Sequence, residues 1–118
     1  MALIEIRDLT KVYPLGQNMF GGGGHGEVRV WSLMDGPLPP FDCVLGCELD
    51  PEGVVGVHVQ QECTEVVIVT EGHGEAQVGA EKIALRPGVV VRLPLGEKLS
   101  LVNGSDVDTL RYLIVKVR

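Results

Sequence analysis

Apolar and polar residues alternate along most of the chain in short runs, and no long stretch repeats with the period of a helix. The runs are rich in Val, Ile and Leu, and Gly, Pro and Asn separate them. This pattern is typical of β-strands with one buried face. We therefore expect an all-β chain with strands near residues 3–9, 27–34, 43–49, 54–59, 65–71, 75–78, 81–85, 89–93, 99–103 and 109–117.

The residues between the runs predict how the strands connect. Segments 71–74 and 78–81 have the glycines of tight hairpin turns, whereas 86–88 and 103–106 are typical of loops between two sheets. Many short strands joined in this way favour a closed antiparallel jelly-roll barrel, because an open sheet would leave its edge strands unpaired.

Composition limits the chain to a few classes of protein. A length of 118 residues, 45% of them hydrophobic and 22% charged, is ordinary for one packed domain. We expect a single domain over 1–118, with an N-terminal strand and a Gly-rich connector in 1–26 and the barrel in 27–118. The net charge of −6 argues against nucleic acid and anionic membrane surfaces as partners.

No apolar stretch is long enough for a membrane span or a signal peptide, so we expect a cytoplasmic protein with reduced cysteines. Residues 1–13 resemble the first strand of an ABC-transporter ATPase. A phosphate-binding loop would need a Lys after its glycines, and the glycine run at 21–26 has none. We interpret residues 20–26 as a mobile connector.

Residues 53–103 contain two motifs with defined spacing. The first comprises Gly53, His58-Val59-Gln60, Glu65 and Gly72, and the second comprises Gly88, Pro94, Gly96, Leu99 and Asn103. They resemble the two motifs of the cupin superfamily, Gly-x5-His-x-His-x3–4-Glu-x6-Gly and Gly-x5-Pro-x-Gly-x2-His-x3-Asn. Gln60 stands where the first motif has its second His, and Leu99 stands where the second motif has its His. The first spacer is also one residue short. The resemblance, closest to small single-domain microbial cupins, implies a double-stranded β-helix or jelly-roll barrel.

In cupins the three His and the Glu bind a transition metal inside the barrel, so the resemblance implies a pocket around His58, Gln60, Glu65 and Leu99. Strand alternation directs His58 and Gln60 to the same face, and Glu65 joins them from the next strand. Leu99 has no donor atom, so His58, Gln60 and Glu65 form at most an incomplete metal site. We expect no cofactor and a hydrogen-bonded pair of His58 with Glu65. The alternative is a divalent transition metal (Ni, Zn, Fe or Mn) on these three residues.

Other candidate residues have ordinary explanations. Cys43 and Cys47 share a strand face with leucines, which favours core positions. We expect Cys63 to be a loop thiol, His73 to be exposed, and Trp31 to anchor either the core or an interface. No catalytic residue can be assigned.

Three functions follow. The favoured one is a barrel that binds a small molecule without a full metal site. The alternatives are a metal-dependent enzyme of the dioxygenase or isomerase type that uses His58, Gln60 and Glu65, and a structural or subunit-interface barrel. The resemblance and the apolar residues Leu3, Ile4 and Ile6 lead us to expect a homodimer in which the N-terminal strands help to close a sheet edge.

Overall fold

The computed structural model describes residues 16–17, 28–34, 38–59 and 63–117. Every regular element in this part of the chain is a β-strand. In chain order the strands are β1 (Gly16–Gln17), β2 (Val28–Ser32), β3 (Phe41–Leu49), β4 (Val54–Val59), β5 (Thr64–Glu71), β6 (Gly74–Val78), β7 (Glu81–Leu85), β8 (Val90–Leu93), β9 (Lys98–Asn103) and β10 (Leu110–Val117).

The strands β2 to β10 confirm the predictions from residue 27 onward, each end to within two residues. The predicted and observed strands agree because inward apolar residues alternate with outward polar residues along them. The short strand β1 lies between the strand expected at 3–9 and the connector expected at 20–26, and it was not predicted. The strand expected at 3–9 and the connector at 20–26 lie outside the described residues.

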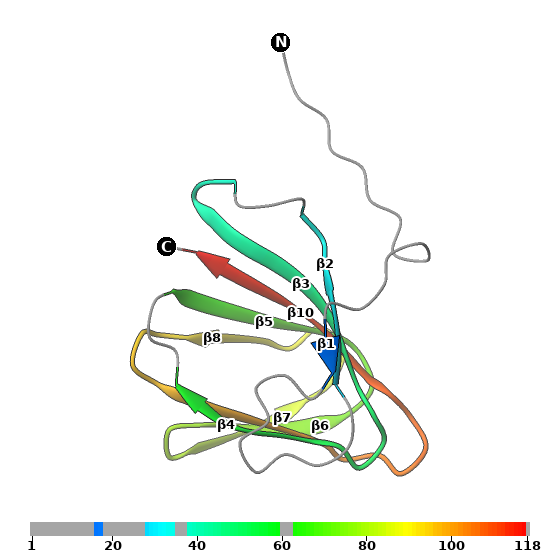
Figure 1. The fold of residues 1–118 in the computed structure, drawn as a ribbon. Helices are drawn as coiled ribbons and strands as arrows, with labels where there is room; N and C mark the ends of the chain where they lie inside the picture. Colours follow the sequence, from blue (N-terminus) through cyan, green and yellow to red (C-terminus); the bar gives the residue numbers. More distant parts are fainter. Residues whose placement is uncertain (1–15, 18–27, 35–37, 60–62, 118) are drawn as a thin grey trace.

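The strands form two antiparallel sheets that face each other. One sheet has the order β1-β2-β3-β10-β5-β8 and the other has the order β4-β9-β6-β7. Figure 1 shows the two sheets as two layers, with β2, β3, β10, β5 and β8 in one and β4, β6 and β7 in the other. The chain therefore has the predicted all-β, antiparallel jelly-roll architecture. In the described residues no helix is long and apolar enough to cross a membrane.

Three of the four predicted connections are confirmed. Val78 pairs with Glu81 at the β6–β7 hairpin, and the segments 86–88 and 103–106 cross between the sheets. The predicted hairpin at 71–74 is wrong, because β5 and β6 belong to different sheets. A Cβ at Gly74 would lie 2.2 Å from the Val102 carbonyl oxygen. Glycine is required there because β6 begins directly against β9, and the segment carries the chain from one sheet to the other.

The core lies between the two sheets and consists of the residues that point inward, which alternate along each strand. Its buried members are Val28, Val30, Leu45, Cys47, Leu49, Val55, Val67, Val69, Ala76, Leu85, Val91, Leu93, Leu99, Leu101, Leu110, Tyr112 and Ile114. Both sheets contribute to this cluster, so burial of apolar surface holds the two layers together.

Asn103, the last residue of the second motif, joins two loops at one end of the core. It is buried, with 2% of its surface exposed. Its Nδ2 donates to the carbonyl oxygens of Leu49, Asp50 and Asp108 at 3.1, 3.0 and 2.8 Å. Its Oδ1 accepts from the Ser105 amide at 2.9 Å. The motif thus places an amide where backbone groups of two turns would otherwise be buried without partners.

Candidate functional site

Glu65 is the buried carboxylate between the sheets. It is the second residue of β5, and the register places it opposite Leu93 on β8 and Lys116 on β10. Only 1% of its surface is exposed. The strand alternation that brings Val67 and Val69 into the core also brings Glu65 there. A carboxylate in such apolar surroundings is costly unless polar groups converge on it.

Cys47 on β3 and Tyr112 on β10 lie side by side, and both belong to the core between the two sheets. They are paired in the β3–β10 register. Burial, with a smaller contribution from Glu65, raises the pKa of Cys47 to about 12. Burial also raises the pKa of Tyr112 well above its usual range, with contributions from Cys47 and Glu65. Both groups therefore stay protonated at neutral pH, so Cys47 is not a thiolate nucleophile.

A second group of polar side chains lies at the end of the barrel where β5 begins, close to Glu65. Lys116 is paired in register with both Cys43 and Glu65. Burial raises the pKa of Cys43, and Lys116 opposes this rise while Asp42, Cys63 and Glu65 add to it. Glu65 is therefore within electrostatic range of Cys43 as well as of Cys47 and Tyr112.

The structure adds detail to the expectations for two residues, Cys63 and Trp31. Cys63 is only 4% exposed, and its Sγ lies 3.6 Å from Oδ2 of Asp42. It lies in the loop between β4 and β5, as expected, and its thiol is buried against the start of β3. Trp31 is half-buried and lies outside the core cluster, so its role as a core anchor is excluded. The core position of Cys47 and the exposure of His73 are confirmed.

Sequence reasoning missed Tyr112 and Lys116, although the chain contains a signal for both. In β10, the inward positions Leu110, Tyr112 and Ile114 are buried in strict alternation. Lys116 continues the same parity and is partly buried. Every second residue of a strand points to the same face, so counting from Leu110 would have placed Tyr112 and Lys116 on the interior face.

His58 of the first motif lies on β4, and Leu99 of the second motif lies on β9. The backbone of His58 pairs with Leu99 in the β4–β9 register, after an irregularity between Val55 and His58. Leu99 is 1% exposed and belongs to the core. The side chain of His58 and the whole of Gln60 lie outside the described residues.

The residues present do not supply the four-ligand metal set of the cupin motifs. Leu99 is a fully buried aliphatic side chain at a position where the motif has an imidazole, and it cannot donate to a cation. In the part of the chain that the structure describes, no group of three or more His, Cys, Asp or Glu side chains could hold a metal ion.

The comparisons with known proteins agree on the fold. A structure described as a predicted oxalate decarboxylase from Thermotoga maritima has a TM-score of 0.84 at 20% identity, with 96% of this chain and 98% of that chain covered. A cupin 2 conserved barrel domain protein from Salinispora arenicola has a TM-score of 0.74 at 25% identity and coverages of 99% and 91%. A cupin 2 conserved barrel domain protein from Rhodopseudomonas palustris has a TM-score of 0.71 at 21% identity and coverages of 90% and 70%.

The search of curated protein sequences gives no significant match. The family model for the cupin domain, in contrast, matches residues 47–116, which is more than half of the 118 residues. This range includes both motifs, the buried Glu65 and the inward face of β10. The chain belongs to the cupin domain family.

Proposed function

We propose that this cupin binds a small organic molecule between its two sheets, next to Glu65, without a complete metal site. The observation that carries the proposal is a carboxylate that is 1% exposed inside an apolar barrel and within electrostatic range of Cys43, Cys47 and Tyr112. Small-molecule sites are typically apolar concavities with a few convergent polar groups.

The chemistry of these groups defines the class of ligand. A carboxylate accepts several hydrogen bonds, so Glu65 can receive a hydroxyl or amine group of a ligand in addition to its protein contacts. The protonated Cys47 and Tyr112 add no negative charge to the interior. Leu93, the register partner of Glu65 on β8, and the other apolar core residues suit a hydrocarbon or aromatic body. We therefore expect a mainly apolar ligand of low molecular weight with one or two hydrogen-bond donors.

A cytoplasmic location is part of the proposal, and the three free cysteines support it. The homodimer expected from the N-terminal segment also remains a proposal, because Leu3, Ile4 and Ile6 lie outside the described residues. The metal-dependent alternative would have to use His58, Gln60 and Glu65 with solvent, and the aliphatic Leu99 disfavours it.

Ligand-observed NMR with benzylamine and benzyl alcohol tests the proposal. Both probes have an aromatic body and one hydrogen-bond donor group. We expect saturation transfer from the full chain to at least one of them, and its loss in Glu65→Leu. Glu75→Gln is the matched control, because Glu75 is an exposed carboxylate on the outward side of β6.

Native mass spectrometry of protein purified without a tag provides a second measurement. A bound organic species that is present in the wild type and in Glu75→Gln but missing from Glu65→Leu would support the proposal. Equal probe signals in all three proteins, or no signal and no bound species in the wild type, would contradict it. A metal in place of the organic species would favour the metal-dependent alternative.

A further inference from the structure

One row of residues across the six-stranded sheet contains a thiol, an ammonium group and a carboxylate. Lys116 on β10 is opposite Cys43 on β3 and opposite Glu65 on β5. Figure 1 shows this part of the sheet, with β10 between β3 and β5. Residues directly opposite each other share a face of the sheet, and their Cβ atoms are about 4.5–5.5 Å apart. This polar row (Cys43, Lys116 and Glu65) therefore places a cation beside an anion on the interior face.

The next row towards the middle of the sheet is apolar. The strand register defines this apolar row as Leu45 on β3, Ile114 on β10, Val67 on β5 and Val91 on β8. All four residues are buried in the core. A molecule whose apolar part lies over the apolar row would therefore have its polar groups at the level of the polar row, near the end of the sheet.

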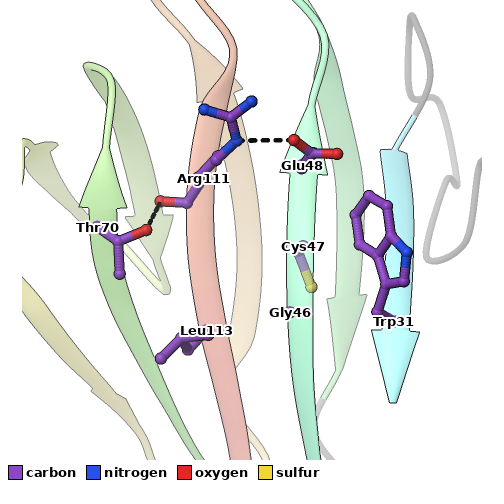
Figure 2. A pocket seen from close by; sticks show the side chains of 7 residues that line it. All are labelled: Trp31, Gly46, Cys47, Glu48, Thr70, Arg111 and Leu113. Carbon is purple, nitrogen blue, oxygen red and sulfur yellow. Dashed lines mark hydrogen bonds and ion pairs between the residues drawn. The ribbon is translucent and has the colours of Figure 1, made fainter. Parts of the chain in front are cut away.

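The position of these charges distinguishes them from the ion pairs on the outer face of the same sheet. There Glu48 and Arg111 are 2.7 Å apart, beside a hollow of about 280 Å³ that Trp31 and Leu113 flank (Figure 2). The two charged side chains are 21% and 47% exposed, so water solvates them and the pair is of little energetic consequence. Glu65, in contrast, is 1% exposed, and a charge at such a position is costly unless opposite charge converges on it.

Lys116 and Glu65 both act on the buried thiols, in opposite directions. Burial raises the pKa of Cys43 and raises that of Cys47 to about 12. In both cases Glu65 adds to the rise and Lys116 opposes it. An ammonium group has three donors and a carboxylate has about four acceptor positions, so each can bind a ligand group and keep its protein contacts.

We propose that the polar row recognises an α-amino acid with an apolar side chain. The carboxylate of the ligand pairs with Lys116, its ammonium group pairs with Glu65, and its side chain lies over the apolar row. This inference rests on the proposed ligand site next to Glu65. It adds an acid group to the expected ligand and identifies Lys116 as the residue that selects for it.

A ligand with both charges suits this site better than one with a single charge. In an α-amino acid the two charged groups are bonded to the same carbon, so they can meet neighbouring residues of one row at the same time. A simple amine would match only Glu65, and a simple acid would match only Lys116. Either of them would also bring a net charge into the interior, which is unfavourable where few groups can solvate it.

Three probes with the same aromatic ring separate the two contacts. L-Phenylglycine is benzylamine with a carboxylate on the same carbon, and phenylacetate has the carboxylate without the amine. Isothermal titration calorimetry of the full chain measures their dissociation constants. We expect L-phenylglycine to bind at least about tenfold more tightly than either of the other two, because hydrogen bonds between charged groups are the strong ones.

Substitutions in the polar row should change this preference in defined ways. Lys116→Met keeps an unbranched apolar stem, and it should reduce the affinity for L-phenylglycine to that for benzylamine while benzylamine still binds. Lys116→Arg retains the positive charge and should keep the preference for L-phenylglycine. Glu65→Gln should weaken L-phenylglycine and benzylamine but not phenylacetate. Lys98→Met is the matched control, because Lys98 is an exposed residue at the start of β9.

Far-UV circular dichroism verifies that each variant is folded before titration. The inference is overturned if the wild type binds benzylamine but binds L-phenylglycine no more tightly, or if folded Lys116→Met keeps the wild-type preference. An equal loss of preference in Lys98→Met would also overturn it. In these three cases the proposed ligand site next to Glu65 would stand. If none of the probes bound to the wild type, the ligand site and this inference would both be contradicted.

Discussion

Replacing Asn103 with Ala tests whether the last residue of the second motif serves the scaffold rather than a ligand. The side chain is 2% exposed and its Nδ2 serves three backbone carbonyl oxygens, while its Oδ1 accepts one backbone amide. An alanine side chain can make none of these hydrogen bonds, so the backbone groups that Asn103 serves would lose their partner.

The magnitude follows from the number of hydrogen bonds. Two N–H groups and one acceptor oxygen are lost, each with a net value of about 1 kcal/mol, so Asn103→Ala should lower the free energy of unfolding by about 3 kcal/mol. For a chain of this length that loss corresponds to a decrease of roughly 10–15 °C in the melting temperature. It is also a substantial part of the roughly 5–15 kcal/mol that stabilises an ordinary domain.

Urea denaturation followed by far-UV circular dichroism, at one fixed protein concentration, measures the effect. Ser105→Ala is the matched control in the same loop. The Ser105 hydroxyl accepts from the exposed amides of Val107 and Asp108 at 3.2 and 2.9 Å, so its loss should cost less than about 1 kcal/mol. If Asn103→Ala and Ser105→Ala unfold at the same urea concentration, the structural role of Asn103 is refuted.

Two further predictions concern the core and the crossover between the sheets. The thiol of Cys47 has a pKa of about 12 in the folded chain against an ordinary value of 9.0, so the unfolded state loses its proton first as the pH rises. Stability should therefore be intact below pH 9 and fall between about pH 9 and 12, by up to about 1.4 kcal/mol per pH unit, with Tyr112 adding to the decrease at the alkaline end. Urea midpoints at pH 8 and pH 11 measure this, and an equal decrease in Cys47→Ala and wild type would count against it. Gly74→Ala should be far more damaging than Gly88→Ala, because its Cβ would lie 2.2 Å from the Val102 carbonyl oxygen, whereas nothing lies within 4 Å at Gly88 despite its φ of +91°. Thermal melts that show equal losses would contradict this ranking.

Local sequence patterns were sufficient to predict the strands β2 to β10. The alternation in β5 and β10 indicates which residues are buried, and the glycine at the β6–β7 turn identifies the hairpin. Motif spacing then identified the family and brought Glu65 and Leu99 to attention. Each of these signals depends on residues that are close together in the chain.

The remaining features depend on which strands become neighbours. Lys116 meets Glu65 and Cys43 only because β10 lies between β3 and β5, which is a long-range pairing that local patterns do not encode. The connection 71–74 was misread for the same reason, since glycines in a reversal and glycines at a close crossing look alike in sequence. Trp31 was ambiguous until the register placed it on the outer face of its sheet.

Metal content tests the central claim most directly, namely that the cupin scaffold is retained while the ligand positions at Gln60 and Leu99 have changed. The measurement is elemental analysis of protein purified without an affinity tag, combined with nickel titration calorimetry of the wild type and of the double variant Gln60→His/Leu99→His. We expect much less than one transition metal per wild-type chain. The double variant should bind about one nickel per chain with an affinity higher by orders of magnitude, because two imidazoles replace a weak amide and an aliphatic group. Leu99→His should also lower the stability of the metal-free variant, and nickel should restore it. One tightly bound metal per wild-type chain, or a folded double variant with no gain in nickel affinity, would contradict the account.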